Sequence, residues 1–260
     1  MKIKFNNIPK SSTKLALALL AVATFISCQQ INKTGIAKKP NIIFIYVDDL
    51  GYGDVSAYGA TAVKTPNVDS LANNGLKFTD AHCSASTCTP SRFALLTGSY
   101  AFRNNAAILP GDAPLIINPA QETIADMLKS AGYATGVVGK WHLGDHPSFM
   151  PLNQGFDSFF GLPYSNDMWP VHYDGSPSTD WKKSIPTLPL ILNKDTFALI
   201  NTLQEQGNLT KQYTERAISF IESNKKEPFF LYLAHSMPHV PIAVSNRFNN
   251  YTGKGLFADL

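Results

Sequence analysis

The stretch PNIIFIYVDD, residues 40–49, decides the fold of this 260-residue chain. Its unbroken run of β-branched and aromatic residues at 42–47 predicts a strand buried on both faces, as in a parallel sheet. The run stops at Asp48 and Asp49, and glycines at 51 and 53 follow in a predicted loop. Two adjacent carboxylates repel each other unless a positive group lies between them. The strand end therefore predicts either a solvated turn or a site for a hard divalent cation such as calcium.

Helical and strand patterns alternate after this first strand. Apolar spacing and glycine or proline boundaries predict helices over residues 67–74, 90–97, 121–130 and 212–224. Short apolar runs predict strands over residues 133–138 and 228–234. Strands separated by helices indicate an α/β fold with a mostly parallel central sheet and helices on both faces. Residues 145–209 are rich in proline and polar residues and predict long loops, which in this class often build the functional site.

The first 28 residues predict an export signal rather than part of the fold. Four lysines precede an apolar run at 15–25, which is too short to span a bilayer and is typical of a signal-peptide core. The segment FISC, ending at Cys28, resembles a lipoprotein cleavage site, although simple secretion also fits. Cleavage before Cys28 would leave residues 29–39 as a polar tether. We therefore expect an exported protein, either periplasmic or held at the outer membrane as a lipoprotein.

Composition excludes some classes of function. Hydrophobic residues make up 44% and charged residues 16%, as in an ordinary globular protein. The formal charge of +3 comes from lysines in the predicted signal, and no basic stripe remains for nucleic acid. Cysteines number three, at positions 28, 83 and 88, too few for a disulfide framework. Cys83 and Cys88 could pair locally, but the sequence around Cys88 indicates a different fate.

The segment CTPSR, residues 88–92, carries the clearest chemistry. Pro90 is tolerated in the first turn of a helix, so Cys88 should lie near a helix N-terminus, where the unpaired N–H groups favour an anion. Arg92 adds a planar, permanently charged donor suited to a tetrahedral oxyanion. These residue types alone fit equally well a buried structural cysteine beside a surface arginine.

The longer segment CTPSRFALLTG, residues 88–98, resembles the signature of the type I sulfatases, C-x-P-S-R-x-x-x-L-T-G. Residues 40–54 resemble the first strand and metal loop of the same family. The resemblance implies an alkaline-phosphatase-like fold and oxidation of Cys88 to formylglycine by a separate maturing enzyme. It also implies calcium bound by Asp48, Asp49 and the modified Cys88, with Arg92 in the catalytic site. Asp54 is expected to be structural.

The segment GKWHLG, residues 139–144, follows the predicted strand at 133–138 directly. Lys140 and His142 would share one face if strand geometry persisted. A lysine can neutralise a sulfate oxygen, and a histidine can hold or move a hydroxyl proton. This segment also resembles a recurrent sulfatase motif, which implies that Lys140 contacts sulfate and His142 hydrogen-bonds the formylglycine hydroxyl.

The segment HSMPHVP, residues 235–241, follows the last predicted strand, where α/β sheets place ligands. Two histidines four residues apart could indicate zinc, but no third ligand lies nearby in sequence. The segment resembles the sulfatase loop H-x-x-x-H-x-P, which implies that His239 binds sulfate and protonates the leaving alcohol, with His235 structural. The segment before Ser165 resembles one that ends in a sulfate-contacting serine, and a backbone cap is the other interpretation of Ser165.

Taken together, these motifs predict an arylsulfatase-like sulfuric ester hydrolase acting on a sulfated small molecule or sulfated glycan. One hydroxyl of the hydrated aldehyde would attack sulfur and the other would then expel sulfate. The family has further metal ligands, another lysine and a smaller C-terminal domain after the motifs seen here, so we expect residues 40–260 to be the N-terminal part of the catalytic domain. Without that remainder the calcium site would be incomplete and no activity is expected.

Two other functions remain open at this stage. A phosphatase or phosphodiesterase of the same superfamily would use serine or threonine with zinc. A lipid-anchored protein that binds sulfated glycans would keep Cys88 unmodified. The tryptophans Trp141, Trp169 and Trp181 are predicted to be packing residues or pocket walls.

Overall fold

The computed structural model describes residues 38–110, 114 and 116–260 of the chain, and residues 40–260 form one compact unit. The predicted signal, the cleavage site at Cys28 and most of the tether lie outside the described residues. Within the described part, no helix is both long enough and apolar enough to cross a membrane.

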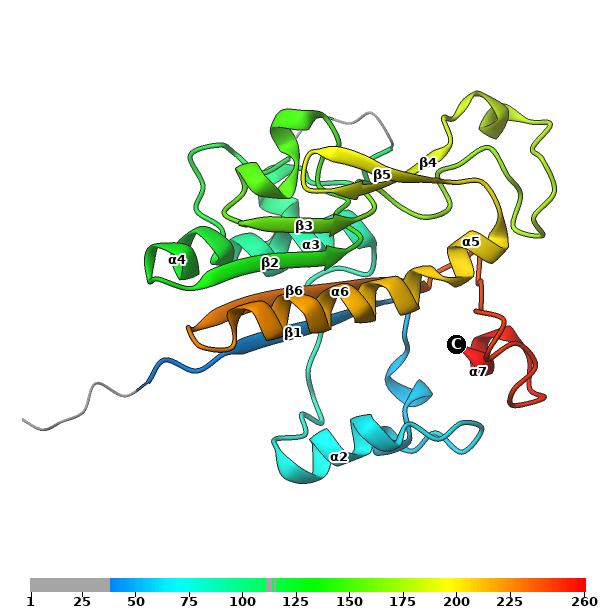
Figure 1. Cartoon of the computed structure of the whole chain (residues 1–260), viewed down its shortest axis with the longest axis horizontal. Helices are drawn as coiled ribbons and strands as arrows, with labels where there is room; N and C mark the ends of the chain where they lie inside the picture. Colours follow the sequence, from blue (N-terminus) through cyan, green and yellow to red (C-terminus); the bar gives the residue numbers. More distant parts are fainter. Residues whose placement is uncertain (1–37, 111–113, 115) are drawn as a thin grey trace, which may run out of the picture. The chain divides into compact units, whose positions relative to one another are not determined.

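The central sheet has six strands among the described residues, in the order β1-β6-β2-β3-β4-β5. The first four in this order run parallel, and β3, β4 and β5 pair antiparallel (Figure 1). The strands are β1 (Ile42–Asp48), β2 (Ala134–Gly139), β3 (Ser158–Gly161), β4 (Leu188–Leu192), β5 (Asp195–Ile200) and β6 (Phe229–Pro238).

α-Helices lie between β1 and β2 and between β5 and β6, and one follows β6. The α-helices are α2 (Pro66–Asn74), α3 (Cys88–Thr97), α4 (Ile124–Ser130), α5 (Leu203–Gly207), α6 (Leu209–Asn224) and α7 (Leu256–Asp259). Short 3-10 turns occur at Tyr52–Asp54, Ser56–Tyr58, Ala101–Asn104, Pro147–Phe149, Pro151–Asn153 and Trp181–Ser184, the last of which is η6.

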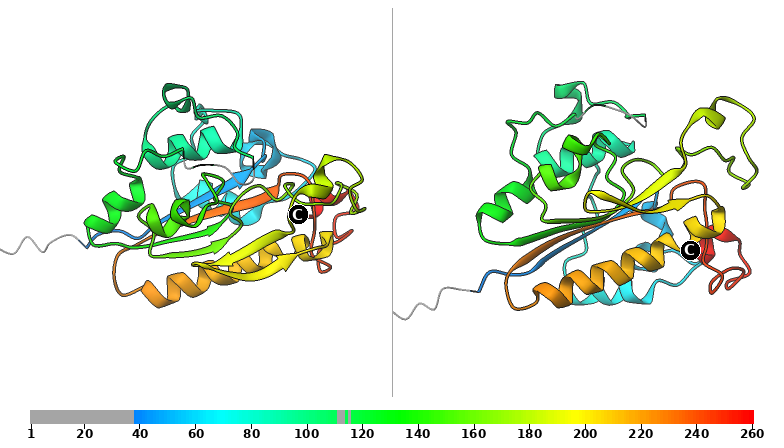
Figure 2. Two further views of the ribbon diagram at one scale, coloured as in Figure 1. Left: turned by 90° about the horizontal axis from the view of Figure 1, so that it is seen from above. Right: turned by 45° about the horizontal axis from the view of Figure 1, so that its top comes forward.

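Hydrophobic residues on β6 alternate between two cores, one on each face of the sheet. Phe230, Tyr232 and Ala234 pack with residues of α3 and α4 on one face. Phe229, Leu231 and Leu233 pack with residues of α6 on the other. The left view in Figure 2 shows the sheet between these helices. The expected α/β architecture with helices on both faces is confirmed, and it follows from the period-two alternation of a strand with two apolar faces.

Two predictions about the fold are wrong. Residues 145–209 are not only loops, because β3, β4, β5 and α5 lie within them. The first strand is not buried on both faces either: Ile43 and Ile45 are about half exposed, at 47% and 53%. The reason is its place in the sheet, since β1 pairs with β6 alone among the described strands.

The carboxyl ends of the parallel strands meet at one edge, which places the chemical residues together. Asp48 ends β1 and Lys140 follows β2 directly. A register shift between Val47 and Asp48 sets Asp48 opposite Pro238 of β6, so that His239 comes next to the end of β1. Residues from separate sequence motifs therefore lie close together at this edge of the sheet.

Close backbone approach at the end of β2 and β3 requires glycine. A Cβ on Gly161 would lie 1.8 Å from the carbonyl oxygen of Gly139, and a Cβ on Gly139 would lie 1.8 Å from that of Ala234. Gly139 also has a φ of 117°, a conformation that other residues rarely adopt.

We expect Gly161→Ala to lower the free energy of unfolding by about 3 kcal/mol, because backbone atoms of paired strands cannot shift to admit the methyl group. The measurement is urea and thermal unfolding of the variant against the parent. Gly53→Ala is the matched control, since nothing lies within 4 Å of a Cβ there. Equal unfolding midpoints for Gly161→Ala and Gly53→Ala would contradict the packing described for the sheet.

Candidate active site

Cys88 is the first residue of α3, two residues earlier than the predicted helix start. Most of the following turn is buried, including Thr89, Pro90 and Arg92. The helix ends at Gly98, whose left-handed conformation lets its N–H bond the carbonyl of Ala94. Burying this helix against the sheet points its N-terminus, with residue 88, at the cluster of strand ends.

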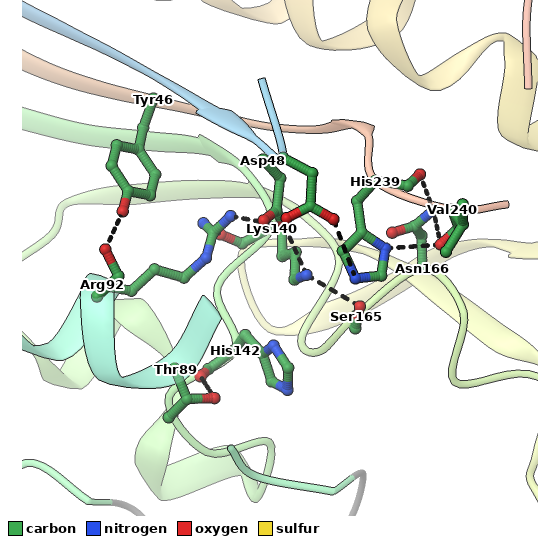
Figure 3. A network of polar contacts seen from close by, with 12 residues as sticks. Tyr46, Asp48, Thr89, Arg92, Lys140, His142, Ser165, Asn166, His239 and Val240 are labelled. Carbon is green, nitrogen blue, oxygen red and sulfur yellow. Dashed lines mark hydrogen bonds and ion pairs between the residues drawn. The ribbon is translucent and has the colours of Figure 1, made fainter. Parts of the chain in front are cut away.

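Asp48 is the centre of the charged network in Figure 3. Its Oδ2 accepts hydrogen bonds from Arg92 Nη2 at 3.1 Å and from Lys140 Nζ at 2.6 Å. Arg92 also donates from Nη1 to the carbonyl of Lys140 at 2.6 Å, and its guanidinium lies over the ring of Tyr46. Burial raises the pKa of Asp48, but the charges of Arg92 and Lys140 outweigh it and hold that pKa below its ordinary value. The carboxylate therefore stays ionised between two cations.

This network carries an excess of positive charge in a buried place. The side chains of Arg92 and Lys140 are fully buried, and that of Asp48 is 7% exposed. One carboxylate faces two cations, so an additional anion would be stabilised here. Lys140 Nζ also donates to Ser165 Oγ at 2.9 Å, which brings Ser165 into the cluster as predicted from its resemblance, although its role stays a prediction.

His142 presents a defined nitrogen to residue 88. Its Nε2 lies 2.7 Å from the carbonyl oxygen of Leu109, which can only accept, so Nε2 carries a proton. Its Nδ1 is buried and has no hydrogen-bond partner among the described residues. Nδ1 is available to residue 88: it can accept from a hydroxyl group there when the ring is neutral, and it can donate to an anion there when the ring is protonated.

The backbone conformation that places His142 in the site differs from the predicted strand. Strand geometry does not persist after β2, because Gly139 and His142 have φ values of 117° and 58°. Lys140 and His142 are nevertheless both buried in the cluster. The carbonyl of His142 accepts from Thr89 Oγ1 at 3.1 Å, and this bond ties the segment to α3.

The ring of His239 carries its proton on the other nitrogen from that of His142. Its Nδ1 lies 2.6 Å from the carbonyl oxygen of Val240, so Nδ1 carries a proton and Nε2 faces the site. Nε2 is 3.9 Å from Oδ2 of Asp49. Burial lowers the pKa of His239, but contact with Cys88 and the charge of Asp48 outweigh this and raise it above its ordinary value. Protonated His239 can therefore donate a proton at Nε2.

The neighbouring side chains shift the pKa of the Cys88 thiol. Burial raises the pKa of Cys88, yet the side chains of His142 and His239 and the charge of Lys140 lower it from 9.0 to about 5. An anionic group at this position is thus strongly favoured over a neutral one. Cys83, the other described cysteine, is exposed and unpaired with Cys88, so the structure contains no local disulfide between them.

A buried amide pair escaped the sequence analysis. Asn166 and Gln206 are fully buried, and Gln206 Nε2 donates to the backbone oxygen of Asn166 at 2.8 Å. Asn166 Nδ2 lies 3.4 Å from the carbonyl oxygens of both His239 and Val240 (Figure 3). This pair holds the loop that carries His239. Neither amide belongs to a short motif, and the position of Asn166 next to Ser165 in the sequence was the available signal.

The remaining predicted residues have separate places. His235 lies in β6, and the centre of its ring is 6.1 Å from that of Tyr213 in α6, as expected for a structural residue. Asp54 accepts from the N–H of Gly51 at 2.7 Å and closes the turn after β1, also a structural role. Asp49 has a φ of 64°, which turns it away from the strand direction, and its side chain is 59% exposed.

A calcium ion would find part of its ligand set here. Asp48 and Asp49 supply carboxylate oxygens, the donor type that calcium prefers, but calcium takes six to eight oxygens. Among the described residues, no group of three or more acidic, histidine or cysteine side chains could hold a metal. The donors present therefore fit one side of a calcium site.

The arrangement of a parallel sheet, a helix N-terminus and charged strand ends defines a hydrolase-like α/β site for a tetrahedral anion. The family model described as Sulfatase matches residues 40–256. The chain belongs to the sulfatase family, and its fold is the alkaline-phosphatase-like fold of these proteins.

Individual relatives agree with this family. An N-acetylgalactosamine-6-O-sulfatase of Bacteroides thetaiotaomicron is 38% identical, across 96% of this chain and 59% of its own length. Arylsulfatase G of Rattus norvegicus is 38% identical across 85% of this chain and 45% of its own. A crystal structure of a sulfatase from Pseudoalteromonas superposes with a TM-score of 0.75 at 26% identity, across 97% of this chain and 53% of that one. The chain thus spans about half the length of these relatives.

We expect the unmodified thiol of Cys88 to be alkylated by iodoacetamide at a rate that rises through about pH 5 and then levels off, because the thiolate is the nucleophile. Protein made without a maturing enzyme and kept in chelator is suitable, with peptide mass spectrometry as the readout. His239→Gln should move the midpoint to higher pH. A midpoint near the ordinary value of 9.0 would contradict the electrostatics described here.

Proposed function

We propose that the complete protein is a sulfatase that hydrolyses sulfate esters of sugars, using formylglycine made from Cys88. One observation carries the proposal: Cys88 is the first residue of the buried helix α3 and lies beside His142 and a buried cluster in which Arg92 and Lys140 share one carboxylate. The Sγ atom of Cys88 stands where a hydroxyl of hydrated formylglycine would lie. That group supplies one hydroxyl for attack on sulfur and a second whose deprotonation releases sulfate.

The cationic side chains bind and orient the sulfate group. Lys140 Nζ is held between Asp48 and Ser165, so its position is fixed before substrate arrives. Arg92 is equally fixed by Asp48 and the carbonyl of Lys140. Such preorganised charges stabilise the negative charge that builds up on sulfate oxygens in the transition state.

Each of the two histidines would carry out one proton transfer. His142 Nδ1 is an acceptor beside residue 88 and would take a proton from its hydroxyl. His239, whose Nδ1 proton is held by the carbonyl of Val240, would donate a proton from Nε2 to the leaving alcohol oxygen. A proton acceptor and a proton donor held in one site would allow the base step and the acid step of the same reaction.

Calcium is the proposed cofactor. Asp48 and Asp49, with an oxygen of the modified residue 88, would hold it, and the family's further ligands would complete its shell. A bound divalent cation would polarise the sulfate oxygens. The maturing enzyme that oxidises Cys88 is a necessary partner in this proposal.

Sulfated sugars are the proposed substrate class. The relative from Bacteroides thetaiotaomicron is an N-acetylgalactosamine-6-O-sulfatase. N-acetylgalactosamine 6-sulfate is therefore the first substrate to test, beside the general reagent nitrophenyl sulfate.

We expect Cys88→Ala to abolish sulfate release in the full-length protein co-expressed with a maturing enzyme, because alanine can form no hydroxyl nucleophile. Sulfate release from both substrates is the measurement. Cys83→Ala is the control and should keep parental activity, since Cys83 is exposed and outside the charged network. Sulfate release by Cys88→Ala at the parental rate would contradict the proposal.

The same preparations separate the rival functions. Faster hydrolysis of nitrophenyl phosphate than of nitrophenyl sulfate would indicate a phosphatase. An unchanged cysteine mass at residue 88, together with glycan binding and no turnover, would indicate the binding protein. Formylglycine at residue 88 has a lower mass than cysteine, which supports the sulfatase.

We also propose export and lipidation at Cys28, supported by the lysine-rich head, the apolar run and the residues before Cys28. We expect the parent to enter the detergent phase on Triton X-114 partitioning and Cys28→Ala to lose this behaviour, because the lipid is attached through the thiol. Identical partitioning of the two proteins would contradict lipidation.

A further inference from the structure

The hydroxyl of Thr89, the residue that follows Cys88 in α3, bonds two other segments of the chain. Its Oγ1 donates to the carbonyl of His142 at 3.1 Å and accepts from the N–H of Leu109 at 3.2 Å. A third bond joins those two segments directly, since Nε2 of His142 lies 2.7 Å from the carbonyl oxygen of Leu109. Thr89, Leu109 and His142 thus form a closed ring of three hydrogen bonds.

We propose that Thr89 is a positioning residue, whose hydroxyl fixes both the backbone that carries the His142 ring and the carbonyl that this ring bonds. Nδ1 of His142 is thereby kept turned to residue 88. The inference rests on the proposed function, in which this nitrogen takes a proton from the formylglycine hydroxyl. The signature C-x-P-S-R leaves position 89 open, so the resemblance assigns no role to Thr89.

Each group in this ring of bonds can act in only one sense. The carbonyl of His142 can only accept and the N–H of Leu109 can only donate, so the Thr89 hydroxyl gives its proton to the first and a lone pair to the second. Thr89 and His142 are 0% and 1% exposed, so water does not reach the bond between them. Without the hydroxyl, the carbonyl of the buried His142 would lose a partner, which costs free energy. Serine can keep both bonds of Thr89, whereas valine can keep neither.

His142 depends on such support because of its backbone conformation. Its φ of 58° lies in the left-handed region, which residues other than glycine adopt only where the surroundings hold them. Its N–H donates to the carbonyl of Pro163 at 3.0 Å, and its carbonyl is the group that Thr89 bonds (Figure 3). Losing one of these two backbone bonds would let the segment relax and the ring turn with it.

Leu109 needs an anchor for a different reason. It belongs to no helix or strand of the described chain, so no regular secondary structure fixes its carbonyl. The bond from its N–H to Thr89 attaches it to the buried first turn of α3. The carbonyl that selects the protonated nitrogen of His142 is therefore placed by the same hydroxyl that holds the His142 backbone.

Thr89→Val tests the inference, because valine has nearly the shape of threonine but no hydroxyl. The sample is full-length protein with isotope-labelled histidine and an unmodified Cys88, and the NMR signal of the proton on His142 Nε2 is assigned by its absence in His142→Gln. We expect this proton to exchange with water about tenfold faster in Thr89→Val than in the parent, because its bond to Leu109 opens more often. Thr89→Ser should keep the slow exchange. Should Thr89→Val fail to fold, Thr89→Ala answers the same question.

The matured enzyme gives a second measurement. Rates are divided by the fraction of residue 88 found as formylglycine, so that an effect on maturation does not enter. Thr89→Val should lower kcat for sulfate release about tenfold and change KM less than about twofold, since Arg92 and Lys140 keep their positions. Thr89→Ser should keep most of the parental kcat.

Thr135→Val is the matched control. Thr135 is also fully buried, and its Oγ1 likewise donates to a carbonyl, that of Gly155 at 2.8 Å, and accepts from an N–H, that of Asp157 at 3.0 Å. It lies in β2 outside the network around Asp48. Thr135→Val should therefore lower stability but leave the Nε2 proton exchange of His142 and kcat unchanged.

The inference is overturned if the parent shows no slowly exchanging proton on His142 Nε2, or if Thr89→Val leaves that exchange or kcat at the parental value. It is also overturned if Thr135→Val changes both quantities as much as Thr89→Val does. Failure of the proposed function looks different, because the parent would then release sulfate from no substrate. The exchange measurement would still report whether Thr89 holds the ring.

Discussion

The carboxylate of Asp48 holds the catalytic part of this molecule together. It ends β1, receives Arg92 from α3 and Lys140 from the end of β2, and so joins three elements that are far apart in sequence. Removing one partner of a buried ion pair typically costs about 3–5 kcal/mol, because the remaining charge is left unpaired. Here two cations depend on one carboxylate. The same shortage of negative charge that makes the cluster costly to bury favours an additional anion there.

Two backbone carbonyls set the chemistry of the histidines. The carbonyl of Leu109 fixes the proton of His142 on Nε2, and that of Val240 fixes the proton of His239 on Nδ1. Each ring therefore turns its other nitrogen towards the region of residue 88. For His239, contact with Cys88 and the charge of Asp48 favour the charged form of the ring. Two identical side chains thus acquire different roles through the hydrogen bonds made by the chain around them.

The sequence predicted the residues of the cluster better than it predicted how the chain brings them there. Cys88, Arg92, Lys140 and His142 were found because the segments at 88–98 and 139–144 resemble sulfatase motifs, whereas their residue types alone left other interpretations open. The common face of Lys140 and His142 was inferred from strand alternation, whereas a left-handed residue at His142 produces it.

The antiparallel strands β4 and β5 were missed for a physical reason. Pro189 lies within β4, and a run of polar residues at 193–196 joins it to β5, so neither strand shows the clear alternation that predicts sheet. Asn166 and Gln206 act through tertiary contacts alone, which local sequence does not record.

The charged cluster and the segment around Trp181 belong to different kinds of structure in this chain. The sulfate cluster comes from strand ends and the first turn of α3, which are buried and tied to the two hydrophobic cores, so any change there also changes the stability of the fold. Trp181 and Ser184 belong to a 3-10 turn outside both cores. Substitutions in that turn can therefore leave Asp48, Arg92 and Lys140 in place. Residues whose positions must be exact are shared with the fold, whereas an exposed turn outside the cores can vary.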